Sequence, residues 1–363
     1  MHIVYLTPNF YPSIGGIETY VYELSRRLAD RGHEVSVVTS DRLRNGKRLK
    51  KFEEIYGIKV YRVPFKLVMR YNFSPSALKM LPNLDYDVLH INSIGFFTDI
   101  IPIIKSRKSG KIIVSTHGGI FHTPHMKFIK KIYFKSLVKE SLKHADFIIA
   151  TSHNDFKLFS KICDKSKIGV AYPGVNWTEL GKLKRVKNKN TLLYVGRFAE
   201  NKRLDRMLHV MAELKVRVKD AKLLLIGEDW GEKTELLKLA KKLNLKNHVR
   251  FLSKIRNHYR YFSKSNIFLL SSEYEGFGTS VVEAMASGLP AIVNDIETIH
   301  EIVENGKNGF IVDFENYKKA AEIISSVLEN TNLQKRLGRN ARISTKKFDW
   351  NGIIDRIEKI YEK

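Results

Sequence analysis

Two glutamates, Glu275 and Glu283, bracket a Gly-Phe-Gly stretch in EYEGFGTSVVEA, residues 273–284. Glycines have no side chain, so they let the backbone approach a ligand closely. The following TSVVEAMA is typical of a helix start, with Thr279 or Ser280 as the expected cap. Unpaired amides at a helix start attract anions, and carboxylates accept hydrogen bonds from vicinal hydroxyls. The segment therefore suits a ligand with both an anionic group and hydroxyls, such as a nucleotide sugar.

Other loops also place polar residues or glycines directly after apolar runs. Arg197 and Lys202 follow TLLYVG and precede a helical stretch, where two fixed cations could hold a diphosphate. Gly15 and Gly16 precede an amphipathic stretch, so their amides could face a phosphate or a sugar. His117 follows KIIVST, where it could donate a hydrogen bond or share a proton.

Each of these features also has a purely structural interpretation. A glycine pair can form a tight strand-to-helix turn, and a lone histidine is usually structural. Most basic residues are solvated, and a glutamate near a helix start can simply favour the helix dipole. What favours a binding site is the recurrence of such loops after several strands of one chain.

The elements that must position these loops follow from short apolar runs that alternate with amphipathic helical stretches. This alternation is typical of parallel sheets with crossover helices. The expected strands are HIVYL, EVSVVT, KVYRV, DVLHI, KIIVST and DFIIA in the first half and TLLYVG, KLLLIG, HVRFL, IFLLS, AIVN and GFIVD in the second. Each set suffices for its own doubly wound sheet, which binds ligands at the carboxyl ends of its strands. If the two sheets face each other, the ligand lies between them.

The length of 363 residues suits two domains better than one core. The Lys- and Asn-rich stretch GKLKRVKNKN separates the two sets of strands. We expect an N-terminal domain over 1–172, a linker over 173–190, a C-terminal domain over 191–347 and a final helix over 348–363.

Composition limits the location and the partners of the protein. The net charge of +25 is spread over both halves, and it favours phosphorylated ligands, anionic membrane surfaces or nucleic acid. No apolar run is long enough to cross a bilayer, and MHIVYLTPNF lacks the pattern of a signal peptide. The single Cys163 excludes an internal disulfide and carries no metal motif. We therefore expect a cytoplasmic protein.

Basic residues gather locally in RLRNGKRLKK (42–51) and in a predicted helix, HMKFIKKIYFKSLVKESLK (125–143). The cations expected on the surface of this helix are Lys127, Lys130, Lys131, Lys135 and Lys139. Apolar residues such as Phe128 and Ile132 lie between them, and a basic amphipathic helix can lie on an anionic membrane. This interpretation predicts a peripheral protein on the inner face of the cell membrane, with a lipid-linked or other membrane-held acceptor. The alternative is a packed helix whose lysines face water.

The stretches GGIE, STHGG, YPGV, GRFAENK, EGFGTSVVEAMASGLPAIVND and ENGKNGFIVD span nearly the whole chain. In these stretches the chain resembles glycosyltransferase family 4, whose members are retaining enzymes of the GT-B architecture. The resemblance implies an α/β fold of two facing Rossmann-like, doubly wound domains, with a C-terminal helix that crosses back to the first. It also implies transfer of a hexose from a nucleotide sugar, UDP- or GDP-linked, to a hydroxyl of a glycan or lipid-linked acceptor. No metal and no further cofactor are implied, and DYD at 85–87 precedes a strand and is interpreted as structural.

The resemblance also implies roles for the polar residues of the second half. Arg197 and Lys202 would hold the donor diphosphate, Glu275 the sugar hydroxyls and Glu283 the ribose. The backbone amides of Gly276, Phe277 and Gly278 would meet the donor sugar, next to Thr279.

In the first half, Gly15 and Gly16 would approach the phosphates and His117 would contact the transferred sugar. The departing phosphate would help to deprotonate the acceptor hydroxyl, so that no protein nucleophile is needed. His117, Arg197, Lys202 and Glu275 are then the expected catalytic residues.

Rival functions fit the motifs less well. A nucleotide-sugar epimerase has the same architecture, but it is not expected to carry this glutamate pair together with GRFAENK. A nucleic-acid-binding module would explain the charge, but the chain shows no recognised motif or stacking platform for it. A dinucleotide dehydrogenase needs G-x-G-x-x-G after its first strand, and the glycines do not fit. The family pattern is altered at PGVN (173–176), at Ser253 and at GEDWG (227–231), which leaves the donor base open.

Overall fold

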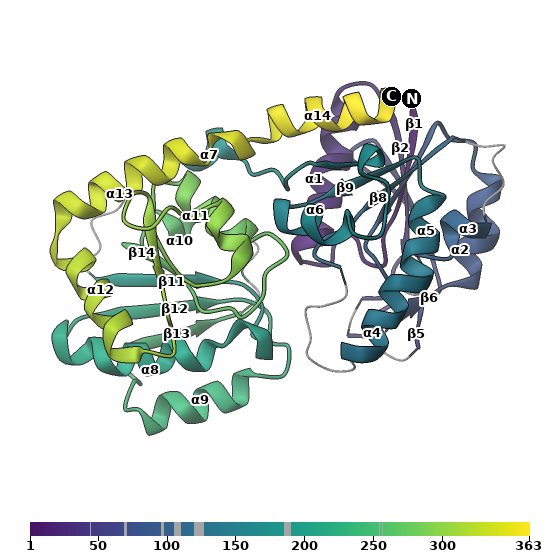
Figure 1. The fold of residues 1–363 in the computed structure, drawn as a ribbon. Coiled ribbons are helices and arrows are strands. Elements are labelled where there is room, and N and C mark those ends of the chain that lie inside the picture. The colour runs from purple at the N-terminus through teal and green to yellow at the C-terminus, as the bar shows by residue number, and fades with distance from the viewer. Residues whose placement is uncertain are drawn as a thin grey trace. The chain divides into compact units, whose positions relative to one another are not determined.

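The computed structural model describes residues 1–43, 45–68, 71–95, 98–104, 110–119, 127–184, 190–253, 255 and 257–363. The chain forms two compact units, shown in Figure 1. The first comprises Met1–Pro173 and Asn351–Lys363, and the second comprises Gly174–Trp350.

The sequence predicts a linker over 173–190. From Gly174 onward, the described residues of this segment belong to the second unit. It forms helix α7 (Trp177–Gly181). The Trp177 indole Nε1 donates to the Arg342 carbonyl at 3.0 Å. The Arg342 guanidinium lies 4.3 Å from the Trp177 ring centroid, so the tryptophan anchors this helix. The polar composition of the stretch gave no sign of this anchor.

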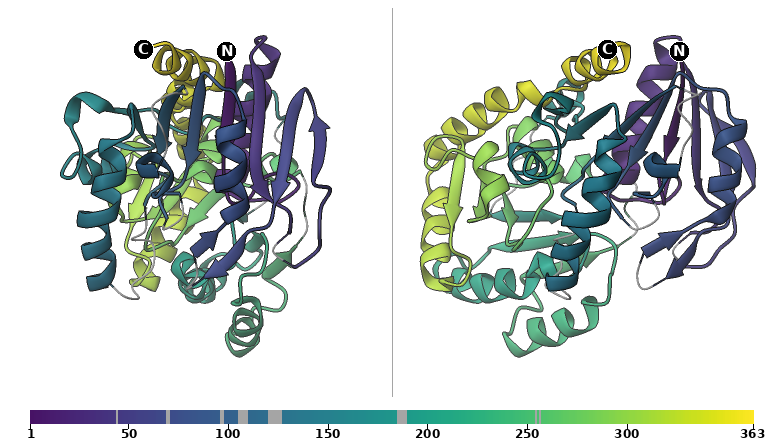
Figure 2. Two further views of the ribbon diagram at one scale, coloured as in Figure 1. Left: turned by 90° about the vertical axis from the view of Figure 1, so that its right-hand side faces the viewer. Right: turned by 45° about the vertical axis from the view of Figure 1, so that its right-hand side comes forward.

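The first unit contains an eight-stranded sheet in the order β10-β9-β8-β7-β1-β2-β4-β3. Its strands are β1 (His2–Leu6), β2 (Glu34–Ser40), β3 (Phe52–Ile55), β4 (Ile58–Val63), β7 (Val88–Asn92), β8 (Lys111–Ser115), β9 (Phe147–Ala150) and β10 (Ile168–Val170). All neighbours pair in parallel except β3 and β4, which pair antiparallel at one edge. Separately from this sheet, β5 (Lys66–Val68) pairs antiparallel with β6 (Tyr71–Phe73). Figure 2 shows the strands of the large sheet side by side.

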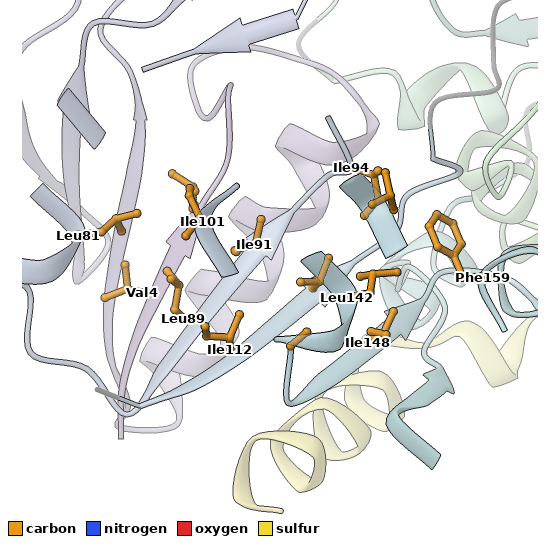
Figure 3. Packing of buried hydrophobic residues seen from close by; sticks show 14 of the residues in the cluster. Val4, Leu81, Leu89, Ile91, Ile94, Ile101, Ile112, Leu142, Ile148 and Phe159 are labelled. Atoms are coloured by element: carbon orange, nitrogen blue, oxygen red, sulfur yellow. The ribbon is translucent and has the colours of Figure 1, made fainter. Parts of the chain in front are cut away.

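Helices cover this sheet because its strands are apolar on both faces, as parallel strands usually are. They are α1 (Gly16–Asp30), α2 (Pro75–Met80), α3 (Ile101–Ile104), α4 (Lys127–Tyr133), α5 (Lys139–Lys143), α6 (His153–Phe159) and α14 (Trp350–Glu362). A π-helical turn over Phe134–Val138 joins α4 to α5. Figure 3 shows the core of this unit, where Val4, Leu89 and Ile148 of the sheet pack with Leu142 of α5 and Phe159 of α6.

The C-terminal helix α14 belongs to the first unit, as the expected fold class requires. The Tyr361 hydroxyl lies 2.6 Å from His90 Nδ1 and 3.0 Å from the Tyr5 hydroxyl, all three within the core. His90 Nε2 lies 2.7 Å from Ser115 Oγ, and burial lowers the pKa of His90 to about 3. A buried polar network therefore fixes this helix to the sheet.

The second unit contains a parallel six-stranded sheet in the order β13-β12-β11-β14-β15-β16. Its strands are β11 (Thr191–Val195), β12 (Lys222–Ile226), β13 (Val249–Leu252), β14 (Ile267–Leu270), β15 (Ala291–Asn294) and β16 (Gly309–Val312). Besides α7, its helices are α8 (Leu204–Arg217), α9 (Lys233–Lys242), α10 (Tyr259–Phe262), α11 (Thr279–Ala286), α12 (Tyr317–Glu329) and α13 (Thr331–Ser344). Contacts join α8 to α9 and α12, and α11 to α7 and α13.

Every strand that the apolar runs predicted is present, and the two-sheet α/β fold is confirmed. Each sheet is doubly wound, because chain order reverses between β1 and β7 in one and between β11 and β14 in the other. Ligands of such sheets bind outside the carboxyl ends of the strands at this reversal. Among the described residues, no helix has both the length and the apolar character needed to span a bilayer.

Candidate active site

In the second unit, the loops after β11 and β14 bring Lys202 and Glu275 together although they are far apart in sequence. Lys202 Nζ donates to both oxygens of the Glu275 carboxylate, at 2.7 and 2.8 Å. The Ser272 hydroxyl donates to the same carboxylate at 2.7 Å. Both side chains of the ion pair are mostly buried, with 10% and 13% of their surface exposed. The pair is thus a fixed charge arrangement rather than two solvated surface groups.

The backbone that carries Glu275 is also held by side chains. Thr298 donates its hydroxyl proton to the Glu275 carbonyl at 3.0 Å, and Asn294 donates its amide to the Ser272 carbonyl at 3.1 Å. Both donors follow or end the neighbouring strand β15. The loop is therefore supported before any ligand binds.

The glycine stretch between the two glutamates leads directly into α11. Gly278 has a φ of 98° and occupies the cap position, while α11 begins at Thr279. A side chain at position 278 would be strained by this φ, which explains the glycine. The expected cap by Thr279 or Ser280 is wrong, because Gly278 is the cap residue and no side chain caps this helix.

Phe277 contributes its backbone rather than its ring to this loop. The ring is 5% exposed and packs edge-on against Phe348, with ring centroids 5.3 Å apart. The first amides of a helix have no intrahelical acceptor, so the start of α11 offers donors to an anion or a sugar oxygen.

Glu283 lies in the second turn of α11 and is 9% exposed. His258 Nε2 lies 3.0 Å from one of its carboxylate oxygens, and the Tyr259 hydroxyl donates to the other at 3.2 Å. The Asn176 amide is 3.5 Å from the Tyr259 hydroxyl. Each oxygen has a further lone pair, so the fixed carboxylate can accept two more donors side by side. Vicinal hydroxyls match that arrangement.

Arg197 lies just beyond β11, and its guanidinium carbon is 4.1 Å from the centroid of the Trp230 ring. Trp230 lies in the turn after β12, and the two loops continue the pairing of their strands. The Phe198 amide donates to the Glu228 carbonyl at 2.8 Å, and the Trp230 amide donates to the Phe198 carbonyl at 2.9 Å. Arg197 thus follows a strand end, and its guanidinium lies over an aromatic ring.

No sequence pattern indicated the partners Trp230, His258 and Tyr259. All three lie after strands β12 and β13, at the same edge as the residues that were found. That position was the available signal. Their pairing with Arg197 and Glu283 depends on tertiary contacts that no spacing reveals.

In the first unit, His117 follows β8 and has a φ of 46°. Its Nε2 lies 3.2 Å from Asn92 Oδ1, and Asn92 uses its amide to donate to the His90 carbonyl at 3.2 Å. His117 Nε2 therefore carries the proton. Burial lowers the pKa of His117 to about 3, so the ring is neutral at physiological pH and its Nδ1 is an acceptor.

The backbone around His117 is fixed by Asp155, which lies on α6. The carboxylate accepts from the Gly118 amide at 2.9 Å and from the hydroxyls of Thr116 and Thr151 at 2.5 and 2.8 Å. The turn that presents the histidine is consequently rigid.

The glycine pair of the first unit lies at the start of α1, with Gly15 as its cap residue. A side chain at position 15 would meet the Glu18 carboxylate, whereas one at position 16 would meet nothing in the described structure. Packing therefore does not explain the glycine at position 16.

Three of the lysines predicted on the basic helix, Lys131, Lys135 and Lys139, are exposed. The prediction for Lys130 is wrong, because this residue is 8% exposed and burial lowers its pKa. The helix turns Lys130 inward on the same stripe as the buried Phe134. The side chain of Lys127 lies outside the described residues.

Comparison with known proteins identifies the family of the chain. Residues 14–179 match the family model described as Glycosyltransferase Family 4, and residues 175–344 match the model described as Glycosyl transferases group 1. The GDP-mannose:cellobiosyl-diphosphopolyprenol alpha-mannosyltransferase of Xanthomonas campestris is 29% identical over 98% of this chain and 95% of that protein. The N-acetyl-alpha-D-glucosaminyl L-malate synthase of Bacillus anthracis is 27% identical over 97% of this chain and 94% of that protein.

Solved structures with the same fold cover the whole chain. Sucrose-phosphate synthase from Thermosynechococcus elongatus superimposes with a TM-score of 0.81 at 21% identity, over 99% of this chain and 98% of that one. The Anabaena protein HepE, solved with UDP-glucose, superimposes with a TM-score of 0.78 at 20% identity, over 100% and 99%. The chain therefore belongs to glycosyltransferase family 4, and its two Rossmann-like units are those of the GT-B fold.

Proposed function

We propose that the protein is a retaining hexosyltransferase that needs no metal and moves a sugar from a nucleotide sugar to a hydroxyl of a glycan or lipid-linked acceptor. The observation that carries this proposal is the fixed set of charges at the strand ends of the second unit. Lys202 with Glu275, and Glu283 with His258, flank the glycine-rich start of α11. Cations, amides and an oriented carboxylate at one sheet edge suit the parts of a nucleotide sugar.

In this proposal, Glu283 accepts hydrogen bonds from the two ribose hydroxyls. Arg197 and Lys202 hold the diphosphate and offset the negative charge that develops as it leaves. Two such cations supply the stabilisation that a metal ion supplies in other transferases. The start of α11 provides amides for the sugar, and Glu275 both orients Lys202 and accepts from sugar hydroxyls.

The residues of the first unit have different proposed roles. The neutral His117 accepts a hydrogen bond at Nδ1 from a hydroxyl of the transferred sugar. Gly15 and Gly16 allow a phosphate to approach the start of α1. The departing phosphate oxygen takes the proton of the acceptor hydroxyl, so positioning and charge stabilisation account for catalysis.

The test is a thermal-shift screen against UDP-, GDP- and ADP-sugars, with Glu283→Gln as the matched variant. A ligand at a hundred times its Kd stabilises the folded protein by about 2.7 kcal/mol, which is a readily measured rise in Tm. GDP-mannose is the first donor to try, because relatives that cover nearly the whole chain carry it in their names. We expect a shift with one nucleotide series that Glu283→Gln abolishes. No shift with any series in folded protein would contradict the proposal.

The reaction itself is checked by incubating the responsive donor with and without an acceptor. A retaining transferase gives a glycoside whose anomeric configuration matches that of the donor, which NMR detects directly, and an inverted product would contradict retention. Release of an altered sugar without an acceptor would instead indicate an epimerase.

We further propose that the acceptor is held at an anionic membrane and that the protein binds the inner face of the cell membrane peripherally through α4. Phe128, Ile129 and Ile132 expose 75%, 55% and 53% of their surface there. Lys131 on α4 and Lys135 on the π-helical turn that follows it are exposed as well, so apolar area and positive charge coincide. The diphosphopolyprenol acceptor in the name of the Xanthomonas relative supports a lipid-linked substrate.

Vesicle sedimentation tests the membrane proposal. Wild-type protein should bind vesicles rich in phosphatidylglycerol, because each lysine near the surface contributes ~1 kcal/mol of electrostatic attraction. High salt screens this attraction, so the protein should then release the vesicles. Replacing Phe128, Ile129 and Ile132 by serine should abolish binding, whereas the matched change of Lys241 and Lys242 on α9 to alanine should not. Equal binding by the triple variant would contradict the proposed role of α4.

A further inference from the structure

Trp230 occupies an altered turn of the family pattern and is not accounted for by the roles above. The turn GEDWG follows β12 and is fixed by its own hydrogen bonds. Asp229 accepts from the amides of Gly231 and Lys233 at 2.9 and 3.1 Å. The indole Nε1 of Trp230 donates to the Glu228 carboxylate at 3.2 Å, which orients the ring. The ring nevertheless remains 38% exposed, so folding of the core does not explain it.

The partner of this ring is Arg197. The guanidinium carbon is 4.1 Å from the ring centroid, well within the range of a cation–π contact. The loop of Arg197 is joined to the Trp230 loop by two backbone hydrogen bonds through Phe198, at 2.8 and 2.9 Å. Both sides of the contact are therefore anchored to adjacent strands of the sheet.

Stacking leaves the donors of the guanidinium available. A guanidinium that contacts a ring through its face keeps its N–H groups at its edge, where they can bind two phosphate oxygens at once. An arginine that is already ordered loses less side-chain entropy when it binds an anion. The ring thus prepares Arg197 for the ligand without competing for its donors.

We propose that Trp230 is a positioning residue that holds the Arg197 guanidinium ready for the diphosphate of the donor. This inference rests on the proposed function, because it takes the diphosphate as the ligand of Arg197. The two cations of the site are then held by different means: Lys202 by the Glu275 carboxylate, and Arg197 by an aromatic ring. The aromatic support matches the planar shape of arginine, which a lysine lacks.

The test is a double-mutant cycle on the affinity for GDP and UDP, measured by calorimetry with the whole protein. Trp230→Leu should weaken binding roughly two- to fivefold, the size of an exposed cation–π contact, and Trp230→Phe should stay close to wild type. Arg197→Ala should weaken binding more, and adding Trp230→Leu to it should have no further effect, because the ring acts through the arginine. Trp230→Gln serves as the second ring-free variant if the leucine variant fails to fold.

The outcomes separate this inference from the proposed function. If Arg197→Ala weakens nucleotide binding but Trp230→Leu and Trp230→Gln bind as tightly as the wild-type protein, the inference alone is overturned. The inference would also be overturned if Trp230→Leu weakened nucleotide binding equally in the wild-type protein and in Arg197→Ala. The tryptophan would then act independently of the arginine. No binding of either nucleotide by the wild-type protein would overturn the proposed function and this inference with it.

Discussion

The carboxyl edges of the two sheets share one topology but present different chemistry. In the second unit, the groups near the reversal of chain order are charged and already paired, as Lys202 and Glu275 show. In the first unit, the comparable edge presents His117, a neutral ring with a strained backbone and an amide partner. The same scaffold can therefore offer fixed charges for an anion or uncharged hydrogen-bonding groups for hydroxyls, depending on the loops.

The difference has an energetic reason. Paired charges keep their ionisation when partly buried, because each compensates the desolvation of the other. A buried histidine without a countercharge loses its proton instead. The second unit thus keeps paired charges at this edge, whereas His117 in the first unit offers uncharged hydrogen-bonding groups.

The largest expected effect comes from Lys202→Ala, which removes one of the charges on which the comparison rests. Turnover of the donor should fall about 10²- to 10³-fold, as for other losses of preorganised charge stabilisation. Stability should fall as well, because Glu275 would remain mostly buried without its cation. Steady-state kinetics and thermal unfolding measure the two effects. Lys222→Ala, an exposed lysine at the start of β12, is the matched control, and equal turnover by both variants would contradict this account.

A smaller effect is expected from His117→Ala in the first unit. Loss of one uncharged hydrogen bond to the sugar should lower turnover about tenfold while leaving nucleotide affinity unchanged. Because the pKa of His117 is lowered to about 3, this group should add no step to the pH–rate profile in the neutral range. A pH–rate profile of His117→Gln that loses an ionisation near neutrality would show that the ring is charged after all.

His258→Ala should sharpen the comparison within the second unit, because it releases one oxygen of Glu283. Nucleotide affinity should fall about three- to tenfold, a part of what a hydrogen bond to a charged group contributes. His258→Gln keeps a donor and should recover most of the affinity in the same titration. His209 on α8, which stacks on Tyr317 of α12, provides the control, and an equal loss in His209→Ala would count against the role of His258.

The smallest effect on turnover is expected at His90, which lies in the core of the first unit. Its protonation should change the stability of the fold with pH. The unfolded chain protonates His90 near pH 6.5, whereas the folded chain does so only near pH 3. The contribution of the neutral ring is therefore complete above about pH 6.5 and is lost as the pH falls toward 3, by roughly 2 kcal/mol at about pH 5. Chemical denaturation at two pH values should show a smaller difference in His90→Gln. If the difference in stability between the two pH values were the same in His90→Gln as in the wild-type protein, the lowered pKa of His90 would be contradicted.

Much of the fold could be predicted because buried parallel strands are apolar runs bounded by turns. Strand β3 was missed because its sequence, FEEI, is charged at a sheet edge, and β10 because it spans only three residues. Lys130 was misplaced because residues four apart on a helix share a face. The stripe of Phe134 and Val138 is buried, and Lys130 begins it.

Sequence reasoning named the residues of the candidate site, and their roles stay predictions, but it did not indicate the side chains that hold them. Arg197 and Glu283 stand out because each lies after a strand or in the first turns of the next helix. Trp230 and His258 come from other loops and acquire meaning only through contacts with those two residues. Such contacts depend on how the loops are placed in the folded chain, and no local sequence pattern encodes that placement.

The most direct measurement of the central claim is a calorimetric titration of GDP and UDP into wild-type protein and two variants, one in each unit. Glu283→Gln should weaken the binding of the preferred nucleotide at least tenfold, by analogy with other charged hydrogen bonds. His117→Gln should leave it unchanged, because a nucleotide without its sugar lacks the hydroxyl that His117 contacts. Loss of binding in His117→Gln with full binding in Glu283→Gln would contradict the assignment of the nucleotide to the charged edge of the second unit.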